Sequence, residues 1–152
     1  ICGGYQMLGK TVADPDGIEG PPAETAGLGL LDVETTLTAA KKLVEVSGTE
    51  RQTGLPVSGY EMHVGVTSGA DTAQPMLALS TGPDGAVSAD GAVAGCYVHG
   101  LFSSDSYRTA FLQKLRPAAR ETMAYEAGID ATLDALADHL EAHLDLEAMI
   151  DG

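Results

Sequence analysis

A cysteine followed at once by two glycines opens the chain and constrains its local fold more than any other feature. Residues 1–9 read Ile-Cys-Gly-Gly-Tyr-Gln-Met-Leu-Gly. Glycines beside a single reactive side chain permit a sharp turn from a strand into a helix, the geometry known as a nucleophile elbow. The partial positive charge at a helix N-terminus also favours a thiolate. We therefore predict that Cys2 is a nucleophile; a small buried cysteine before a flexible turn is the alternative that this stretch leaves open.

A nucleophilic thiol usually works with a histidine that exchanges protons with it. Of the four histidines in the chain, His99 is the best placed, because it ends an apolar stretch that predicts a short strand passing into a loop. Active sites of parallel sheets collect at such strand ends. Side-chain alternation puts Cys96 on the opposite face from His99, so Cys96 is expected to be buried and a poor rival nucleophile. A histidine that only satisfies hydrogen bonds at a strand end is the alternative interpretation.

Two other patterns match functional motifs only superficially. Residues 4–11 have the spacing of a phosphate-binding loop, but their apolar interior is poorly suited to wrapping N–H groups around an anion. We interpret this match as a coincidence, with a nucleotide-binding domain as a minor alternative. His139 and His143 have the spacing of a zinc-protease helix, yet Leu140 stands where that motif needs glutamate. No metal site is predicted there, and both histidines are expected on a solvated helix face.

The composition describes one soluble domain and argues against several classes of partner. The chain has 152 residues, a hydrophobic content of 44% and a formal net charge of −14. A nucleic-acid surface needs clustered lysine and arginine, so this acidity argues against nucleic acid and also against anionic membranes. No apolar stretch approaches the roughly 20 residues of a membrane span, and no signal peptide is visible. Two cysteines do not form a disulfide framework, which fits a cytoplasmic protein.

The apolar pattern predicts strands through most of the chain and helices at its end. Asp90 and Gly91 form a hairpin turn signal leading into the strand that carries His99. The predicted strands cover residues 28–37, 42–47, 57–67, 76–80, 85–88 and 93–100.

Three helices are predicted. One continues the elbow over residues 5–12, and a second is capped by Ser104 or Asp105 and ends before Pro117. The last begins at about Asp130, and its apolar residues have the spacing of a face that packs into a core. These residues are Leu133, Leu136, Ala137, Leu140 and Leu144.

Four stretches, in the same order over nearly the whole chain, together resemble one family. Residues 2–9 resemble the nucleophile motif of class I (triad-type) glutamine amidotransferases. Three further stretches narrow the resemblance to the cobyric acid synthase branch: Gly-Leu-Leu-Asp-Val-Glu-Thr-Thr at 29–36, Ser-Gly-Tyr-Glu-Met-His-Val-Gly at 58–65 and Gly-Cys-Tyr-Val-His-Gly-Leu-Phe at 95–102. The resemblance implies a three-layer, flavodoxin-like α/β fold, in which helices flank a mixed, mostly parallel sheet.

The resemblance also implies that this chain is part of a larger protein. Residues 1–152 would form the C-terminal part of a glutamine amidotransferase domain, and the N-terminal strands of that domain would be missing from this fragment. An ATP-dependent synthetase domain, with ATP and Mg²⁺, is expected upstream in the parent protein. No cofactor is expected in the amidotransferase domain itself, and the fragment alone is expected to be inactive.

The chemistry implied by the resemblance is glutamine hydrolysis. Cys2 would attack the side-chain amide of glutamine, and His99 would act as general acid and base. The backbone N–H of Gly3 would donate to the oxyanion. The ammonia would serve to amidate four carboxylates of a corrinoid acceptor, adenosylcobyrinate a,c-diamide, in cobalamin biosynthesis. A sister amidotransferase acting on cobyrinate or on a cell-wall lipid precursor, or a non-catalytic interaction module, are the alternatives.

One position departs from the general pattern of class I amidotransferases. Most of them carry His-Pro-Glu, whose glutamate orients the histidine, but Leu101 stands at that place here. The cobyric acid synthase branch is similar in lacking this glutamate. Glu61 is a candidate for orienting His99, since alternation puts Glu61 and His63 on one face of their strand. His63 is expected to line the pocket or to pack locally.

Overall fold

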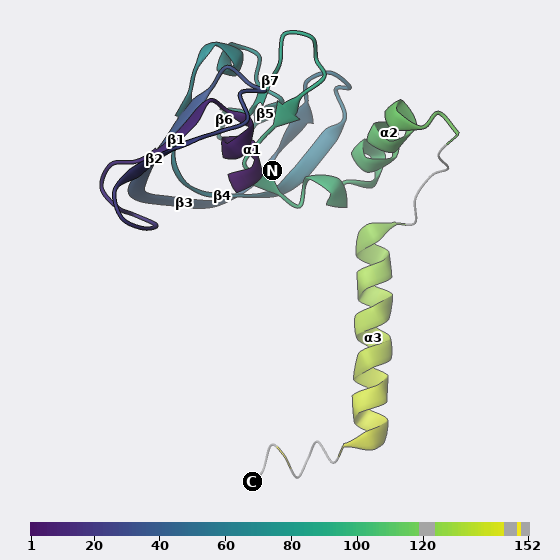
Figure 1. Cartoon of the computed structure of the whole chain (residues 1–152). Coiled ribbons are helices and arrows are strands. Elements are labelled where there is room, and N and C mark those ends of the chain that lie inside the picture. The colour runs from purple at the N-terminus through teal and green to yellow at the C-terminus, as the bar shows by residue number, and fades with distance from the viewer. Residues whose placement is uncertain (119–123, 145–148, 150–152) are drawn as a thin grey trace.

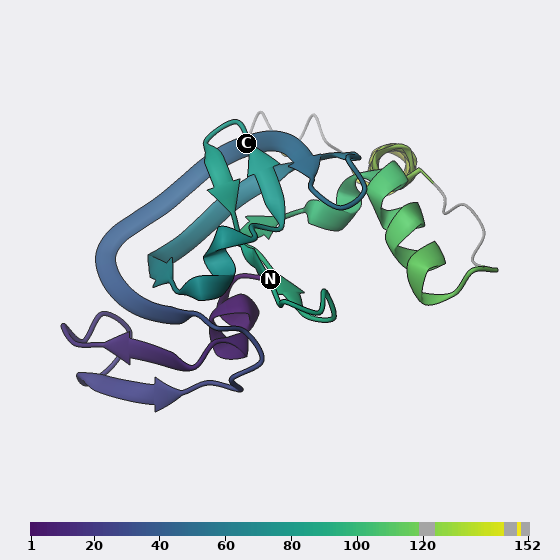
Figure 2. The same ribbon diagram turned by 90° about the horizontal axis from the view of Figure 1, so that it is seen from above.

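The structure is a computed structural model that describes residues 1–118, 124–144 and 149. Figures 1 and 2 show a curved sheet in which β3 bends through a wide arc, with α1 beside the sheet and α2 and α3 beyond one end. The helices are α1 (Gly3–Leu8), α2 (Asp105–Leu115) and α3 (Tyr125–His143), with short 3₁₀ turns at Ala70–Ala73 and Leu101–Ser103. The strands are β1 (Thr11–Asp14), β2 (Ala23–Ala26), β3 (Glu34–Glu50), β4 (Pro56–Ser68), β5 (Leu77–Leu79), β6 (Gly82–Asp84), β7 (Ala86–Val87), β8 (Ala94–Gly95) and β9 (Val98–His99).

Antiparallel pairs dominate the main sheet. Its strand order is β2-β1-β3-β4-β9, with β5 paired to β3 and β6 to β5. Within the described residues, β1 and β3 form the one parallel pair. The predicted α/β class with a mixed sheet is confirmed. The sheet is mostly antiparallel rather than mostly parallel. Short connections join β1 to β2, β3 to β4 and β5 to β6, whereas a parallel pair needs a longer crossover.

Helix α1 is shorter than the predicted helix over residues 5–12. It ends before Gly9, and residues 11 and 12 belong to β1. A Cβ on Gly9 would lie 2.6 Å from the carbonyl oxygen of Val33, and the N–H of Lys10 donates to that same oxygen at 2.8 Å. This close approach directs the chain into parallel pairing with β3, so the prediction of helix beyond Gly9 is wrong.

One long strand takes the place of two predicted ones. β3 contains the predicted strand at 42–47 and the end of the one at 28–37, while residues 28–33 form no strand. The register between β3 and β4 shifts between Thr36 and Lys41, which interrupts the side-chain alternation without ending the strand. The predicted strand at 57–67 is confirmed within β4.

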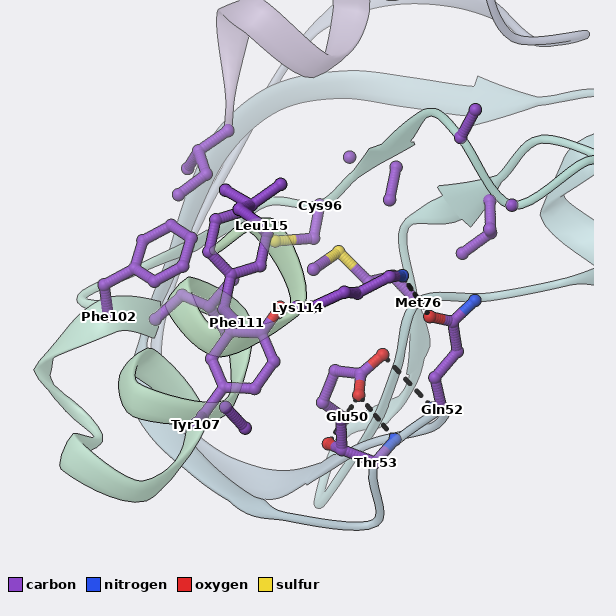
Figure 3. A pocket seen from close by; sticks show the side chains of 18 residues that line it. Glu50, Gln52, Thr53, Met76, Cys96, Phe102, Tyr107, Phe111, Lys114 and Leu115 are labelled. Atoms are coloured by element: carbon purple, nitrogen blue, oxygen red, sulfur yellow. Dashed lines mark hydrogen bonds between the residues drawn. The ribbon is translucent and has the colours of Figure 1, made fainter. Parts of the chain in front are cut away.

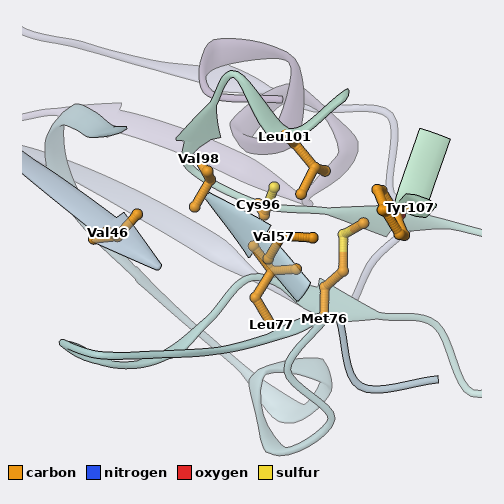
Figure 4. Packing of buried hydrophobic residues seen from close by; sticks show 8 residues of the cluster. All are labelled: Val46, Val57, Met76, Leu77, Cys96, Val98, Leu101 and Tyr107. Atoms are coloured by element: carbon orange, nitrogen blue, oxygen red, sulfur yellow. The ribbon is translucent and has the colours of Figure 1, made fainter. Parts of the chain in front are cut away.

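Two apolar clusters form the core. The first comprises Val46, Val57, Met76, Leu77, Cys96, Val98, Leu101 and Tyr107 (Figure 4). The second comprises Tyr5, Leu31, Val33, Ala86 and Tyr97. In the second cluster the rings of Tyr5 and Tyr97 meet edge to face with centroids 5.1 Å apart. The second cluster therefore joins the helix that follows Cys2 to the segment that leads to His99.

The predicted hairpin before His99 is confirmed, since β7 pairs antiparallel with β8 on either side of Asp90. The strand predicted over residues 93–100 is interrupted, however, and splits into β8 and β9. At the interruption the N–H of Tyr97 donates to the carboxylate of Asp84 at 3.0 Å instead of to a neighbouring strand. The break lets Cys96 and Tyr97 enter different core clusters.

The two C-terminal helices differ in how they are packed. α2 follows Ser104 and ends before Pro117, as predicted. α3 begins at Tyr125, earlier than predicted, and projects away from the sheet (Figure 1). Leu133 and Leu136 are 56% and 50% exposed, so the prediction that this face packs into the core is wrong for the part of the fold that is described. None of the described helices is long and apolar enough to span a membrane.

Gly59 allows β9 to approach β4 closely, which gives a test of this pairing. A Cβ at Gly59 would overlap the carbonyl oxygen of His99 and lie 3.0 Å from a methyl group of Val98. We expect Gly59→Ala to lower the free energy of unfolding by about 1–3 kcal/mol through overpacking. Gly20→Ala is the control, because a Cβ there meets open space. Urea unfolding measures both, and equal midpoints would contradict the close approach of β9 to β4.

Candidate active site

Cys2 has the strained backbone expected of a nucleophile elbow. Its φ of 54° and ψ of −123° make it the one non-glycine residue with positive φ among the described residues. Such sparsely populated conformations cost about 1–3 kcal/mol, so they persist only when surrounding contacts hold them. Here the N–H of Cys2 donates to the carbonyl oxygen of Cys96 at 2.9 Å. The thiol donates to the carbonyl oxygen of Met62 at 3.3 Å.

The backbone N–H groups around Cys2 are not all used by the fold. The N–H of Gly4 donates to the carbonyl oxygen of Ile1 at 3.0 Å, and that of Tyr5 donates to the carbonyl oxygen of Cys2 at 2.8 Å. The N–H of Gly3 has no acceptor within residues 1–118 or the other described segments. A free N–H beside the sulfur is what an oxyanion-hole donor requires.

His99 lies on β9 opposite Tyr60 of β4. The two rings are stacked, with centroids 5.1 Å and planes 8° apart. The Nε2 atom of His99 is buried and has no hydrogen-bond partner among the described residues. Cys2 and His99 are thus both attached to β4, at Met62 and at Tyr60, and no hydrogen bond between their side chains is present in the described structure. An unpaired buried ring nitrogen calls for a partner such as a substrate.

Glu61 is buried in β4, and its partners do not include His99. Its side chain is 6% exposed, and its carboxylate accepts from Nζ of Lys42 at 2.7 Å and from Nε2 of His63 at 3.0 Å. Burial raises the pKa of Glu61, but the hydrogen bonds from Lys42 and His63 outweigh burial and hold the pKa below its ordinary value. Glu61 is therefore an anion at neutral pH, and this geometry does not support the predicted orienting role toward His99.

His63 packs locally, one residue from the carbonyl that contacts Cys2. Its Nδ1 lies 3.2 Å from the carbonyl oxygen of Gly65, and its ring stacks on Tyr97 with centroids 3.8 Å apart. The Tyr97 hydroxyl lies 3.2 Å from Nε2 of Gln6, which donates to it. Gln6 also donates to the carbonyl oxygen of Val64 at 3.2 Å. His63 is therefore part of a network that links β4 to α1.

The sequence comparisons identify the family of this chain. Residues 1–107 match the model of the CobB/CobQ-like glutamine amidotransferase domain. The chain belongs to this family. It is 60% identical over 151 residues to the cobyric acid synthase of Methylorubrum populi and 56% identical over 151 residues to that of Azorhizobium caulinodans, covering 99% of this chain and 31% of each relative. It is also 54% identical over 147 residues to the cobyric acid synthase of Hyphomonas neptunium, covering 97% of this chain and 30% of that relative. This amidotransferase chain therefore spans about a third of the length of these relatives.

Some residues of the amidotransferase site were not singled out from the sequence. Tyr60, Tyr97, Gln6 and Lys42 all contact predicted site residues or join them. Pairing the two long strands could have placed Lys42, which lies opposite His63 in the register of β3 with β4. Gln6 lies inside the nucleophile motif, at a place where an apolar helix pattern gives no sign of a polar contact.

An apolar cavity adjoins the site. It has a volume of about 500 Å³ and lies between α2 and the β-rich part of the chain, with Phe102, Phe111, Met76 and Cys96 among its walls (Figure 3). Neither Cys2 nor His99 lines it. Cys96 is buried in its wall, as predicted, and burial raises the pKa of this thiol to about 12. Cys96 is thus a poor rival to Cys2.

The structure supports neither the phosphate-loop motif at residues 4–11 nor the zinc-protease spacing of His139 and His143. Within residues 4–11 the chain forms α1 and enters β1, and Nζ of Lys10 pairs with Asp32 at 2.5 Å. This helical backbone is unlike a loop that wraps around a phosphate. His139 and His143 are exposed on α3 with their rings stacked 4.2 Å apart, which agrees with a solvated face.

The burial of the two thiols gives a direct prediction. Cys2 is partly exposed and Cys96 is fully buried. We expect iodoacetamide at about pH 8 to alkylate Cys2 in the native protein and to leave Cys96 unmodified until the protein is denatured. Peptide mapping by mass spectrometry measures this, and Cys2→Ser is the control that should abolish native labelling. Native alkylation of Cys96 would contradict the structure.

Asp84 lies near this network, with its pKa shifted upward. Burial raises the pKa of Asp84 and the negative charge of Glu61 raises it further, against a hydrogen bond from the N–H of Tyr97. A carboxyl group with a raised folded pKa makes the folded state less stable as pH rises from the unfolded pKa through the folded one. Ionised Asp84 is therefore a cost to the fold at neutral pH.

Asp84→Asn tests this cost, because asparagine can still accept from the N–H of Tyr97. We expect the variant to be at least as stable as the wild type at about pH 7. As the pH falls toward about 4, the free energy of unfolding of the wild type should rise relative to that of the variant. Urea unfolding across that range measures the difference. Asp138→Asn, on the exposed face of α3, controls for losing one carboxylate. A difference between Asp84→Asn and wild type that does not change with pH would contradict the assignment.

Proposed function

We propose that this domain hydrolyses glutamine and supplies ammonia for the ATP-dependent amidation of four carboxylates of adenosylcobyrinate a,c-diamide, in cobalamin biosynthesis. The observation that carries the proposal is the strained elbow at Cys2, held between β4 and the carbonyl of Cys96 in a member of the glutamine amidotransferase family. Strain of this kind at a reactive side chain is typical of a functional site.

Cys2 is the nucleophile of the proposed reaction. Its sulfur attacks the side-chain amide carbon of glutamine, and the oxygen of the tetrahedral intermediate accepts a hydrogen bond from the N–H of Gly3. Collapse of the intermediate breaks the carbon–nitrogen bond, releases ammonia and leaves a glutamyl thioester. Water then attacks the thioester, so that glutamate leaves and the thiol is restored. The N–H of Gly3, free of partners in the described structure, supports its part in this step.

His99 is the proposed acid and base. It takes the proton of the Cys2 thiol and gives a proton to the departing ammonia, and later it activates the water that cleaves the thioester. Two observations support this role: the unpartnered, buried Nε2 of His99 can accept a proton, and β4 holds both residues, at Met62 and at Tyr60. Stacking on Tyr60 fixes the plane of the ring in place of an orienting glutamate.

The acceptor is proposed from the relatives rather than from this chain. The relatives are cobyric acid synthases about three times as long as the matched region. We assign ATP, Mg²⁺ and the corrinoid to an upstream synthetase domain in the parent protein, which is expected to be cytoplasmic. Within this domain the proposed chemistry needs glutamine and water and no cofactor.

Removing the nucleophile distinguishes amidation that uses glutamine from amidation that uses free ammonia. We expect Cys2→Ala in the full-length protein to lower glutamine-dependent amidation by at least about 1,000-fold, since the thioester cannot form. Amidation driven by added ammonium chloride should stay within about twofold of the wild type, because only the ammonia source is lost. Product formation from adenosylcobyrinate a,c-diamide measures both. Cys96→Ala, which removes the other thiol, is the control.

Each other outcome points to a different function. Normal glutamine use by Cys2→Ala would exclude Cys2 as the nucleophile and favour a non-catalytic interaction module. Glutamine hydrolysis without amidation of the corrinoid would keep the glutaminase and move the acceptor to cobyrinate or a cell-wall lipid precursor. Mass spectrometry after treatment with a diazoketone analogue of glutamine provides a second test, with an adduct expected on Cys2 that excess glutamine prevents.

A further inference from the structure

We propose that Glu61 and His63 form a clamp that positions the Cys2 thiol, a role that rests on the proposed glutaminase function. The two residues flank Met62, whose carbonyl oxygen accepts the hydrogen bond from the thiol. Their side chains lie on the same side of β4 and bond to each other at 3.0 Å. The clamp therefore holds β4 on both sides of Met62, whose carbonyl oxygen accepts the hydrogen bond from the thiol of Cys2.

His63 is fixed by contacts on every polar edge and on one ring face. Nε2 meets the carboxylate of Glu61 and Nδ1 meets the carbonyl of Gly65, while Tyr97 stacks on the ring with planes 18° apart. The side chain is 12% exposed. Each ring nitrogen thus faces a hydrogen-bond acceptor. This arrangement fixes the orientation of the ring, and thereby the path of β4 around Met62.

The clamp is connected to both catalytic segments. Tyr97, under the His63 ring, lies directly after Cys96, whose carbonyl holds the N–H of Cys2, and it precedes β9, which carries His99. The Tyr97 hydroxyl is bonded to Gln6 of α1, the helix that begins next to Cys2. Movement of His63 would therefore be transmitted to the elbow through its helix as well as through Met62.

The charge of Glu61 explains why Glu61 and His63 hold β4 in place instead of only packing against it. Glu61 is 6% exposed and is an anion, and it is compensated by the ammonium group of Lys42 at 2.7 Å as well as by His63. Removing one partner of a buried, hydrogen-bonded charge is costly, because the charge loses part of its compensation. Without His63, Lys42 would be the remaining ionic partner of Glu61, and we expect the backbone at Met62 to be held less firmly.

The test compares His63→Ala with His63→Gln in the full-length protein. Glutamine retains a donor that can reach the Glu61 carboxylate, and alanine retains none. Since misplacement of a nucleophile by about 1 Å can cost about 100-fold in rate, we expect His63→Ala to lower kcat for glutamine hydrolysis about 10- to 100-fold with KM within about threefold of wild type. His63→Gln should recover a substantial part of that loss. His139→Ala and His139→Gln, on the exposed face of α3, are matched controls expected to behave as wild type.

Two further readouts separate positioning from folding and from the proposed function. Ammonia-driven amidation should be unchanged in His63→Ala, and alkylation of Cys2 by iodoacetamide should change in rate while Cys96 stays protected. Wild-type kcat and alkylation rate in His63→Ala would overturn the clamp. Equal losses of glutamine-driven and ammonia-driven activity, or equal losses in the alanine and glutamine variants, would also overturn it in favour of a purely structural role. If the wild-type protein does not hydrolyse glutamine, the proposed function itself fails, and that result is distinct from all of these.

Discussion

The pairing of β3 with β4 is the interaction on which the rest of this domain depends. It extends from Glu34 opposite Ser68 to Thr49 opposite Pro56, and it leaves the other edge of β4 available to β9. That edge receives His99, and the backbone of β4 at Met62 receives the Cys2 thiol. One strand, β4, thereby positions both Cys2 and His99, which lie nearly a hundred residues apart in the sequence. A rigid strand is a more accurate support for reacting groups than a loop, because its backbone is fixed by hydrogen bonds on both sides.

The strain at Cys2 is distributed over contacts that come from distant parts of the chain. A positive φ at a residue with a side chain is unfavourable, and here the carbonyl groups of Cys96 and Met62 hold the residue in place. The same two segments also hold α1, since the side chain of Gln6 donates to the hydroxyl of Tyr97 and to the carbonyl oxygen of Val64. The elbow is therefore held at its turn and again along its helix. Such redundancy explains how a short helix, too short to be stable alone, keeps its position.

The sequence predicted the parts of the molecule whose signals are local. The elbow at Cys2, the strand that became β4, the hairpin at Asp90 and the burial of Cys96 all follow from short patterns. The end of α1 at Gly9 did not, because it is decided by contact with Val33, far along the chain. The partners of Glu61 could not be predicted fully either. Alternation placed Glu61 beside His63, but whether its carboxylate pairs with Lys42 or with His99 depends on the register between strands. For α3 the sequence predicted the helix but not its packing. The periodicity of its apolar residues indicates an amphipathic helix, but it does not indicate what packs against the apolar face.

Two buried carboxylates near the site carry pKa shifts of opposite direction, and the difference lies in their donors. Asp84 receives backbone N–H groups alone, which do not offset its burial, so its pKa rises. Glu61 receives the ammonium of Lys42 and the imidazole of His63, which more than offset burial, so its pKa falls. The negative charge of Glu61 itself contributes to the rise at Asp84. The electrostatics of this region therefore place the fixed anion on β4 beside Met62, where it can hold His63, and leave the neighbouring carboxyl closer to neutrality.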